Sequence, residues 1–287
     1  GGTIYCAGDW DGYSASNYTL TGGTVVLDGG SDGSEEWIRM DNNTSAGLFT
    51  GDSYFYNLTI TGYYYLRGYH PCIKGNLTIS SGGELDTYNE RLFLEGDLVT
   101  GGSGTSSWSS TGAGILNNSS GSVGNSFVHL TGSGDQTIGS FSASNVGIAP
   151  YKSGGTVTAN GYISCGDAYF GYGTSGGTYA NSSTLAIADE TFYVTNIYGN
   201  AGTINVTNTG LLHVYDNDEN TIALDGATLD IDGGELRVGD AASDNLSDIE
   251  ITTGMLDISG GTVNICDELD VANGTVTISG SGTLNIG

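Results

Sequence analysis

Thiol chemistry is the first functional question that this sequence raises, because it contains four cysteines, Cys6, Cys72, Cys165 and Cys266. No two of them form a CxxC pair, so the spacing excludes a zinc ribbon and a thioredoxin-type redox motif, and no CxxCH is present to attach haem. Three interpretations remain open. The cysteines are buried thiols that pack as small hydrophobic groups, or Cys6 and Cys72 form a disulfide, or disulfides join separate molecules, with Cys6 and Cys266 placed nearest the two ends.

The segment DNDEN is the best candidate for a metal site. Asp216, Asp218 and Asn220 have the 1, 3, 5 spacing of the oxygen ligands in a Ca²⁺ loop. The twelfth position is Ala227 rather than Glu, and no Gly occupies the sixth, so the segment is not an EF-hand. The sequence predicts either an acidic turn between strands or a Ca²⁺ site here, and no other cofactor.

Acid–base catalysis is not indicated by the residues that could perform it. A polysaccharide lyase needs a base beside Ca²⁺-binding acids, and a hydrolase needs two facing carboxylates. The six Lys and Arg and the three His are scattered along the chain. Asp230 and Asp232 alternate with the apolar Leu229 and Ile231, so on a strand they point outward. We therefore predict that the protein is not an enzyme.

Modification with glycans is another chemistry that the sequence allows. Asn-x-Ser/Thr sequons are numerous, and the abundance of Ser, Thr and Asn explains many of them by chance. The sequons best placed for a glycan, in turn-like and Ser-rich stretches, are those at Asn117, Asn181 and Asn245.

The charge balance excludes several classes of partner. The 287 residues include 32 Asp and Glu but only 6 Lys and Arg, which gives a formal net charge of −26. Such a surface repels nucleic acids and anionic membranes, and no apolar run is long enough to span a bilayer. We expect no nucleic-acid partner and no membrane insertion. Because the chain begins with Gly1 rather than Met, we also expect a processed or excerpted piece of a longer precursor.

Short strands are the elements that must position these residues. From residue 229 onward, apolar residues recur in pairs two positions apart, as on one face of a strand. The pairs are Leu229/Ile231, Leu236/Val238, Ile249/Ile251, Leu256/Ile258, Val263/Ile265, Leu269/Val271, Val276/Ile278 and Leu284/Ile286. Gly-rich turns such as DGG and SGG separate them, which favours a solenoid over a stack of hairpins. The predicted fold class is all-β, a parallel β-helix or β-solenoid with about 20–25 residues per coil and little or no α-helix.

The same rhythm extends upstream, so we expect one β-solenoid over residues 1–287, with a more irregular Ser- and Gly-rich region at about 101–126. The segment at 54–72 is unusually aromatic. It is a platform for sugars, a protein interface, or ordinary solenoid wall. Alternation places Tyr63 and Tyr65 on one face of a strand and Tyr64 on the other.

Four phrases carry a resemblance to a known class of proteins. They are FYNLTITG (55–62), KGNLTISSGGELD (74–86), LTGSGDQTIG (130–139) and KSGGTVT (152–158). These phrases resemble large secreted prokaryotic surface proteins built of parallel β-helix repeats. The resemblance implies an extracellular, surface-associated protein of the adhesin, sheath or appendage kind, and it implies no catalytic residues.

An open solenoid leaves unpaired backbone groups on its last coils, and pairing those coils between molecules gives a filament. The leading hypothesis is an extracellular structural subunit that assembles end to end into a homopolymeric filament or sheath. The residues expected at contacts between subunits are Ile4, Tyr63, Tyr64, Tyr65, Leu284 and Ile286. The alternatives are a monomeric adhesin stalk or carbohydrate-binding surface module and, third, a polysaccharide-degrading enzyme.

Overall fold

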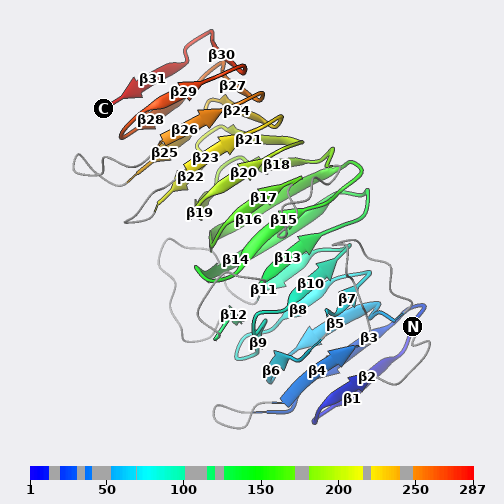
Figure 1. Cartoon of the computed structure of the whole chain (residues 1–287). Coiled ribbons are helices and arrows are strands. Elements are labelled where there is room, and N and C mark those ends of the chain that lie inside the picture. The colour runs from blue at the N-terminus through cyan, green and yellow to red at the C-terminus, as the bar shows by residue number, and fades with distance from the viewer. Residues whose placement is uncertain are drawn as a thin grey trace.

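In the computed structural model, every regular element of the described residues is a β-strand (Figure 1). The description covers residues 1–12, 20–30, 36–40, 53–68, 70–100, 115–119, 126–171, 181–215, 221–239 and 248–287. The strands pair in parallel and wind into a β-solenoid of about nine turns. The fold class predicted from the spacing of the apolar pairs is therefore confirmed.

Three parallel sheets form the walls of the solenoid. The first sheet has 17 strands, which are β1 (Thr3–Cys6), β3 (Thr24–Leu27), β5 (Asn57–Ile60), β8 (Leu77–Ile79), β11 (Leu98–Thr100), β14 (Gln136–Ala143), β16 (Thr156–Cys165), β18 (Thr184–Ile187), β19 (Thr191–Val194), β21 (Thr203–Thr207), β22 (Leu211–Val214), β24 (Thr228–Asp232), β25 (Glu235–Val238), β27 (Met255–Ile258), β28 (Thr262–Ile265), β30 (Thr275–Ile278) and β31 (Thr283–Ile286).

The other two sheets are smaller. The second sheet has nine strands, which are β7 (Cys72–Ile73), β10 (Arg91–Leu94), β13 (Phe127–Leu130), β15 (Gly147–Pro150), β17 (Ala168–Phe170), β20 (Ile197–Gly199), β23 (Thr221–Leu224), β26 (Asp248–Ile251) and β29 (Leu269–Val271). The third sheet has five strands, which are β2 (Trp10–Gly12), β4 (Glu36–Met40), β6 (Tyr63–Leu66), β9 (Glu84–Asp86) and β12 (Ile115–Asn117). The third sheet therefore belongs to the N-terminal part of the solenoid.

The core is a set of aliphatic columns that run along the axis. Leu229 lies between Ile204 of the coil below and Leu256 of the coil above, and all three are fully buried. Polar residues such as Asp230 alternate with them and point outward, as period 2 requires. Burial of each such aliphatic side chain stabilises the fold by about 1.5–3 kcal/mol, so the stacking of coils is the main source of stability.

Coil length varies more than the sequence predicted. Leu77 pairs with Leu98, 21 residues further along, which is within the predicted range. Leu98 pairs with Ile138, 40 residues further along, because the segment at 101–126 is inserted in that coil. Within this segment, which we predicted to be irregular, β12 continues the third sheet, while residues 101–114 and 120–125 lie outside the described residues.

The long strands β14 and β16 change the cross-section of the solenoid. Their register shifts between Gly139 and Phe141. The start of β16 pairs with β18 and its end pairs with β19, so the first sheet supplies two walls from this point onward. Gly161 sits at the bend of β16 with φ +119°, and a Cβ there would lie 2.0 Å from the Ser140 hydroxyl. Only glycine fits this corner.

Candidate interaction surfaces

β1 lies at one end of the stack of coils (Figure 1). There, side chains at positions that face the core elsewhere are exposed. Ile4 stacks on Val25 and Cys6 stacks on Leu27. Val25 and Leu27 are fully buried, whereas Ile4 is 46% exposed and the outward Tyr5 is 71% exposed. Among the described strands β1 pairs with β3, which leaves its other edge with unpaired backbone groups.

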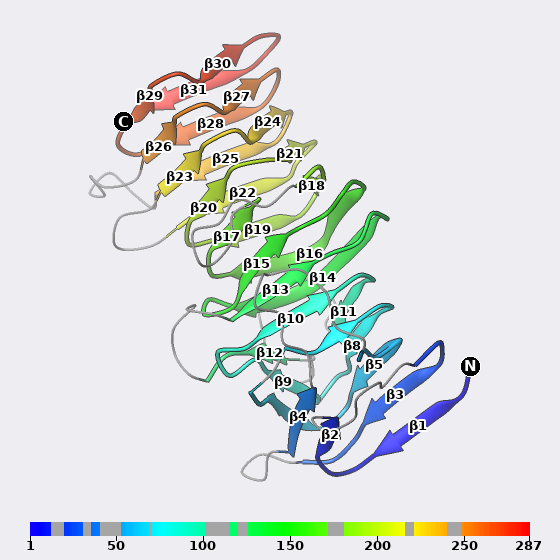
Figure 2. The same ribbon diagram turned by 45° about the vertical axis from the view of Figure 1, so that its right-hand side comes forward.

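The opposite end has the same character. Figure 2 shows β30 and β31 over β27 and β28, the strands with which they pair. Ile278 stacks on the buried Ile258, and Ile286 stacks on the buried Ile265, yet Ile278 and Ile286 are each 51% exposed. Leu284 of β31 is half-buried. The predicted contact residues Ile4, Leu284 and Ile286 therefore lie on the two end faces, and their role in assembly stays a prediction.

The three consecutive tyrosines of β6 divide as alternation predicted. Tyr63 and Tyr65 are half-buried, whereas Tyr64 is fully buried. The Tyr64 hydroxyl accepts a hydrogen bond from the Gly29 amide at 3.0 Å and donates one to the Cys6 carbonyl at 3.0 Å. Burial raises the pKa of the Tyr64 phenol. The expectation that Tyr64 lies at a contact between subunits is wrong, because its side chain is part of the core.

No disulfide joins any of the four cysteines. The disulfide between Cys6 and Cys72, one of the three interpretations, is not present; Cys6 ends β1 of the first sheet and Cys72 begins β7 of the second. Cys72 and Cys165 are buried, and burial raises the pKa of both thiols. They are therefore unreactive at neutral pH and pack as small hydrophobic groups. Cys6 and Cys266 are half-buried, and a disulfide between molecules through them stays a prediction.

Two of the three favoured sequons are built into the solenoid. Asn181 is 5% exposed, and its amide donates to the Ala201 carbonyl at 3.2 Å and accepts from the Ser183 hydroxyl at 2.8 Å. The expected exposed turn at Asn181 is therefore wrong, because this amide is an internal hydrogen-bonding group. Asn117 is half-buried and donates to the Glu84 carboxylate at 3.3 Å. Asn245 lies outside the described residues.

The predicted Ca²⁺ ligands Asp216, Asp218 and Asn220 also lie outside the described residues. Within the ranges that the structure describes, no group of three or more His, Cys, Asp or Glu side chains is arranged to hold a metal ion. The same ranges contain no helix that is long and apolar enough to cross a membrane.

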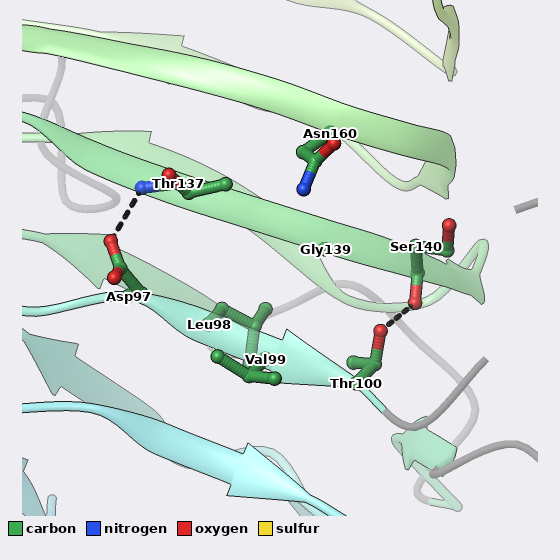
Figure 3. A pocket seen from close by; sticks show the side chains of 8 residues that line it. All are labelled: Asp97, Leu98, Val99, Thr100, Thr137, Gly139, Ser140 and Asn160. Atoms are coloured by element: carbon green, nitrogen blue, oxygen red, sulfur yellow. Dashed lines mark hydrogen bonds between the residues drawn. The ribbon is translucent and has the colours of Figure 1, made fainter. Parts of the chain in front are cut away.

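A shallow polar groove opens on the outer side of the first sheet (Figure 3). It forms because β11 and β14 pair through Leu98 and Ile138 alone. Its volume of about 260 Å³ is below the ~300–1,000 Å³ typical of small-molecule sites. The Asp97 carboxylate accepts a hydrogen bond from the Thr137 amide at 2.8 Å, which bridges the gap in the ladder. Its lining residues are Asp97, Leu98, Val99, Thr100, Thr137, Gly139, Ser140 and Asn160.

An aromatic cluster lies on the outer side of β16, β19 and β22, and sequence reasoning missed it. Tyr193 is at its centre, with ring centroids 5.4 Å from Tyr162, 5.1 Å from His213 and 5.4 Å from Tyr215. These residues come from different coils, and Tyr193 pairs with His213 in the ladder. The three tyrosines are half-buried. The cluster could have been found by aligning the strands of successive coils and comparing their outward-facing residues.

Buried polar groups were also missed. The ring of His129 is fully buried between Phe93 and Tyr151, with centroid distances of 4.7 and 4.9 Å and nearly parallel planes. The ammonium of Lys152, also fully buried, donates to the Thr131 carbonyl at 3.2 Å and to the Gln136 side-chain carbonyl. Burial lowers the pKa of both His129 and Lys152. Both groups contact residues of neighbouring coils and so add to the interactions between coils.

Comparisons of the chain with protein-family models, with curated proteins and with solved structures found no match.

Proposed function

We propose that this protein is an extracellular structural subunit, which assembles end to end into a filament or sheath at a cell surface. In this assembly the end of one copy that is formed by β30 and β31 stacks on the end of the next copy that is formed by β1. The contact is heterologous and does not close, so it repeats along the solenoid axis.

The observation that carries the proposal is the likeness of the two end faces. At one end the core columns finish with Ile4 and at the other with Ile278 and Ile286, and all three are about half exposed (46%, 51% and 51%). Each is the same kind of side chain that the neighbouring coil covers elsewhere. β1 and β30 are the two ends of one parallel ladder in the first sheet, so pairing β30 of one copy with β1 of the next would continue the ladder already present within the chain.

The proposed extracellular location is supported by composition and by the resemblance of the repeat phrases to secreted surface proteins. A net charge of −26 keeps separate copies soluble through repulsion. Assembly must overcome this repulsion, so it should be promoted by salt, which screens exposed charges.

Electron microscopy of the purified 287-residue chain, untagged and at several concentrations and salt levels, tests the proposal. We expect fibres whose axial repeat equals the length of one stacked chain. The fibres should become longer at higher salt. Compact, monodisperse rods under all conditions would exclude self-assembly of this chain.

The second candidate is a monomeric adhesin stalk or carbohydrate-binding surface module. The observation that favours it is the half-buried aromatic cluster around Tyr193 on the outer side of the solenoid. Aromatic rings that present one apolar face and a polar tip suit a ligand that is itself both apolar and hydroxylated. Binding of the chain to a panel of oligosaccharides would separate this candidate from a purely structural role.

A further inference from the structure

One outer face of the solenoid has no net charge, although the molecule is strongly acidic. We define the β19 face as the outward side chains of β19, β22, β25, β28 and β31. Its charged residues are Glu235 and Arg237, and the guanidinium binds the carboxylate at 2.6 and 3.0 Å. The residues of the β19 face are Thr191, Tyr193, Leu211, His213, Glu235, Arg237, Thr262, Asn264, Thr283 and Asn285.

The neighbouring face of the same sheet has the opposite character. On β24 and β27 the outward positions include Asp230, Asp232 and Asp257. Asp230 and Asp257 are directly paired in the ladder. Like charges on adjacent strands of one backbone ladder are unfavourable. The two faces are built from the same kind of parallel strands. They differ in the charge of their outward side chains, which is negative on β24 and β27 and balanced on the β19 face.

The β19 face carries polar groups in register along the axis. Tyr193, His213, Arg237, Asn264 and Asn285 are successive partners in the ladder, one on each coil. The coils are about 4.8 Å apart. The Asn285 amide donates to the Asn264 carbonyl at 2.8 Å, and the Asn264 amide donates to the Glu235 carboxylate at 3.0 Å. Asn285 and Arg237 are exposed and keep further hydrogen-bonding capacity towards solvent.

From these observations we infer that the β19 face binds a neutral polysaccharide that lies along the solenoid axis. Sugar rings stack at the Tyr193 end of the face, where Tyr162 of β16 adjoins it, and hydroxyl groups exchange hydrogen bonds with Arg237, Asn264 and Asn285. A neutral chain meets no repulsion here, whereas a uronate or sulfate would be repelled by the acidic surface around it. The inference rests on the second candidate function, carbohydrate binding, and is independent of end-to-end assembly.

A second copy of the chain is a poorer occupant for this face. Protein interfaces have an apolar, fully buried centre. The large apolar side chains that are exposed in the described residues lie elsewhere, and they are Ile4, Tyr5, Tyr56, Tyr88, Val99, Val271, Ile278 and Ile286. The β19 face instead combines half-buried rings with amide, hydroxyl and guanidinium groups, which suits a hydroxylated ligand.

Affinity gel electrophoresis of the chain tests the inference, with soluble β-glucan and galactomannan as neutral probes and polygalacturonate as the acidic probe. The chain is expected to be retarded by at least one neutral probe, equally at low and high salt, and not by polygalacturonate. The variant Tyr193→Ala should weaken binding about tenfold, which corresponds to loss of one good stacking contact. Tyr88→Ala removes an exposed tyrosine elsewhere and is the matched control (53% exposed).

Because Tyr193→Ala could disturb folding, Asn264→Ala with Asn285→Ala provides a second variant that leaves the aromatic cluster intact, and it should weaken binding about threefold to tenfold. If the chain is retarded and neither variant changes the retardation, the chain binds carbohydrate at another site, and the β19 face is excluded. Absence of retardation by either neutral probe would overturn both carbohydrate binding and this site. A lateral dimer in sedimentation that Tyr193→Ala dissociates would overturn the inference in favour of a second copy.

Discussion

Identical positions in neighbouring coils behave differently in the interior and at the end of this solenoid. Leu256 and Ile258 are fully buried, whereas Val276 and Ile278, which occupy the same positions one coil further on, are half-buried and 51% exposed. The backbone, the register and the side-chain chemistry are the same, and only the covering coil differs. The comparison shows that stacking of one coil on the next is what buries the core, and the proposed assembly would use that same interaction between molecules.

The largest expected effect comes from breaking a covered column. Leu256→Asp places a carboxylate between Leu229 and Val276. These apolar neighbours offer the carboxylate no hydrogen-bonding or charged partner. We expect the free energy of unfolding to fall by more than about 4 kcal/mol, measured by urea denaturation followed by circular dichroism. A loss below about 1 kcal/mol would mean that the interior coils are not tightly packed.

Aspartate substitutions at the end face should have a much smaller effect on stability. Leu284→Asp with Ile286→Asp places carboxylates on side chains that water already reaches, so the free energy of unfolding should change by less than about 1 kcal/mol for each substitution. The same urea experiment measures it. If this variant were as unstable as Leu256→Asp, coverage by a neighbouring coil would not determine how much a side chain contributes to the free energy of unfolding.

Acid should weaken the covered part of the solenoid through His129. Burial lowers the pKa of His129 well below its ordinary value, and Arg91 and His70 add repulsion. The unfolded chain takes up a proton near pH 6.5, and the folded chain does not. The stability due to the neutral ring is therefore complete above the unfolded pKa and decreases as the pH falls below it, by up to about 1.4 kcal/mol per pH unit.

The variant His129→Phe tests this prediction, because a phenyl ring keeps the stack between Phe93 and Tyr151 without a titratable nitrogen. Urea unfolding at about pH 8 and about pH 5.5 should show a smaller loss of stability for the variant than for the natural chain. An equal loss in both proteins would assign the acid sensitivity to other groups.

The smallest effect concerns the outer surface of the same coils. Burial raises the pKa of Asp230, and the neighbouring Asp257 and Asp232 add to the shift. The folded state therefore disfavours the Asp230 carboxylate above its pKa, and this cost disappears as the pH falls through that value. Asp257→Asn should raise the free energy of unfolding by about 0.2–1 kcal/mol at neutral pH. The gain should vanish in acid, and the exposed turn variant Asp28→Asn should show no gain.

The interior of the fold was predictable because alternation alone defines it. Leu229 and Ile231 are aliphatic, two positions apart, and followed by a Gly-rich turn, so the sequence contains the strand, its buried face and its end. The bend of β16 was not predictable in this way. It depends on Gly161 fitting against Ser140 of the coil below, and such a contact appears only after the coils are aligned.

The surfaces were predictable to the extent that they depend on one strand. Ile286 was placed on the end face by its position in β31, and Tyr63 was placed opposite to Tyr64 by alternation. The contact role of Tyr64 was wrong because alternation does not say which face of β6 is inside. The cluster around Tyr193 was missed because it joins residues from separate coils, and the sequence does not state the register between them.

Recognition between the two end faces can be tested by electron microscopy of matched variants. The natural chain and Thr283→Asp, which adds a charge to the outward side of β31, should both form fibres with the repeat of one stacked chain. Leu284→Asp with Ile286→Asp should remain as folded single particles, because its charges lie on the face that must be covered. Fibres of this double variant as abundant as those of Thr283→Asp, or single particles of the natural chain at every concentration, would contradict the account.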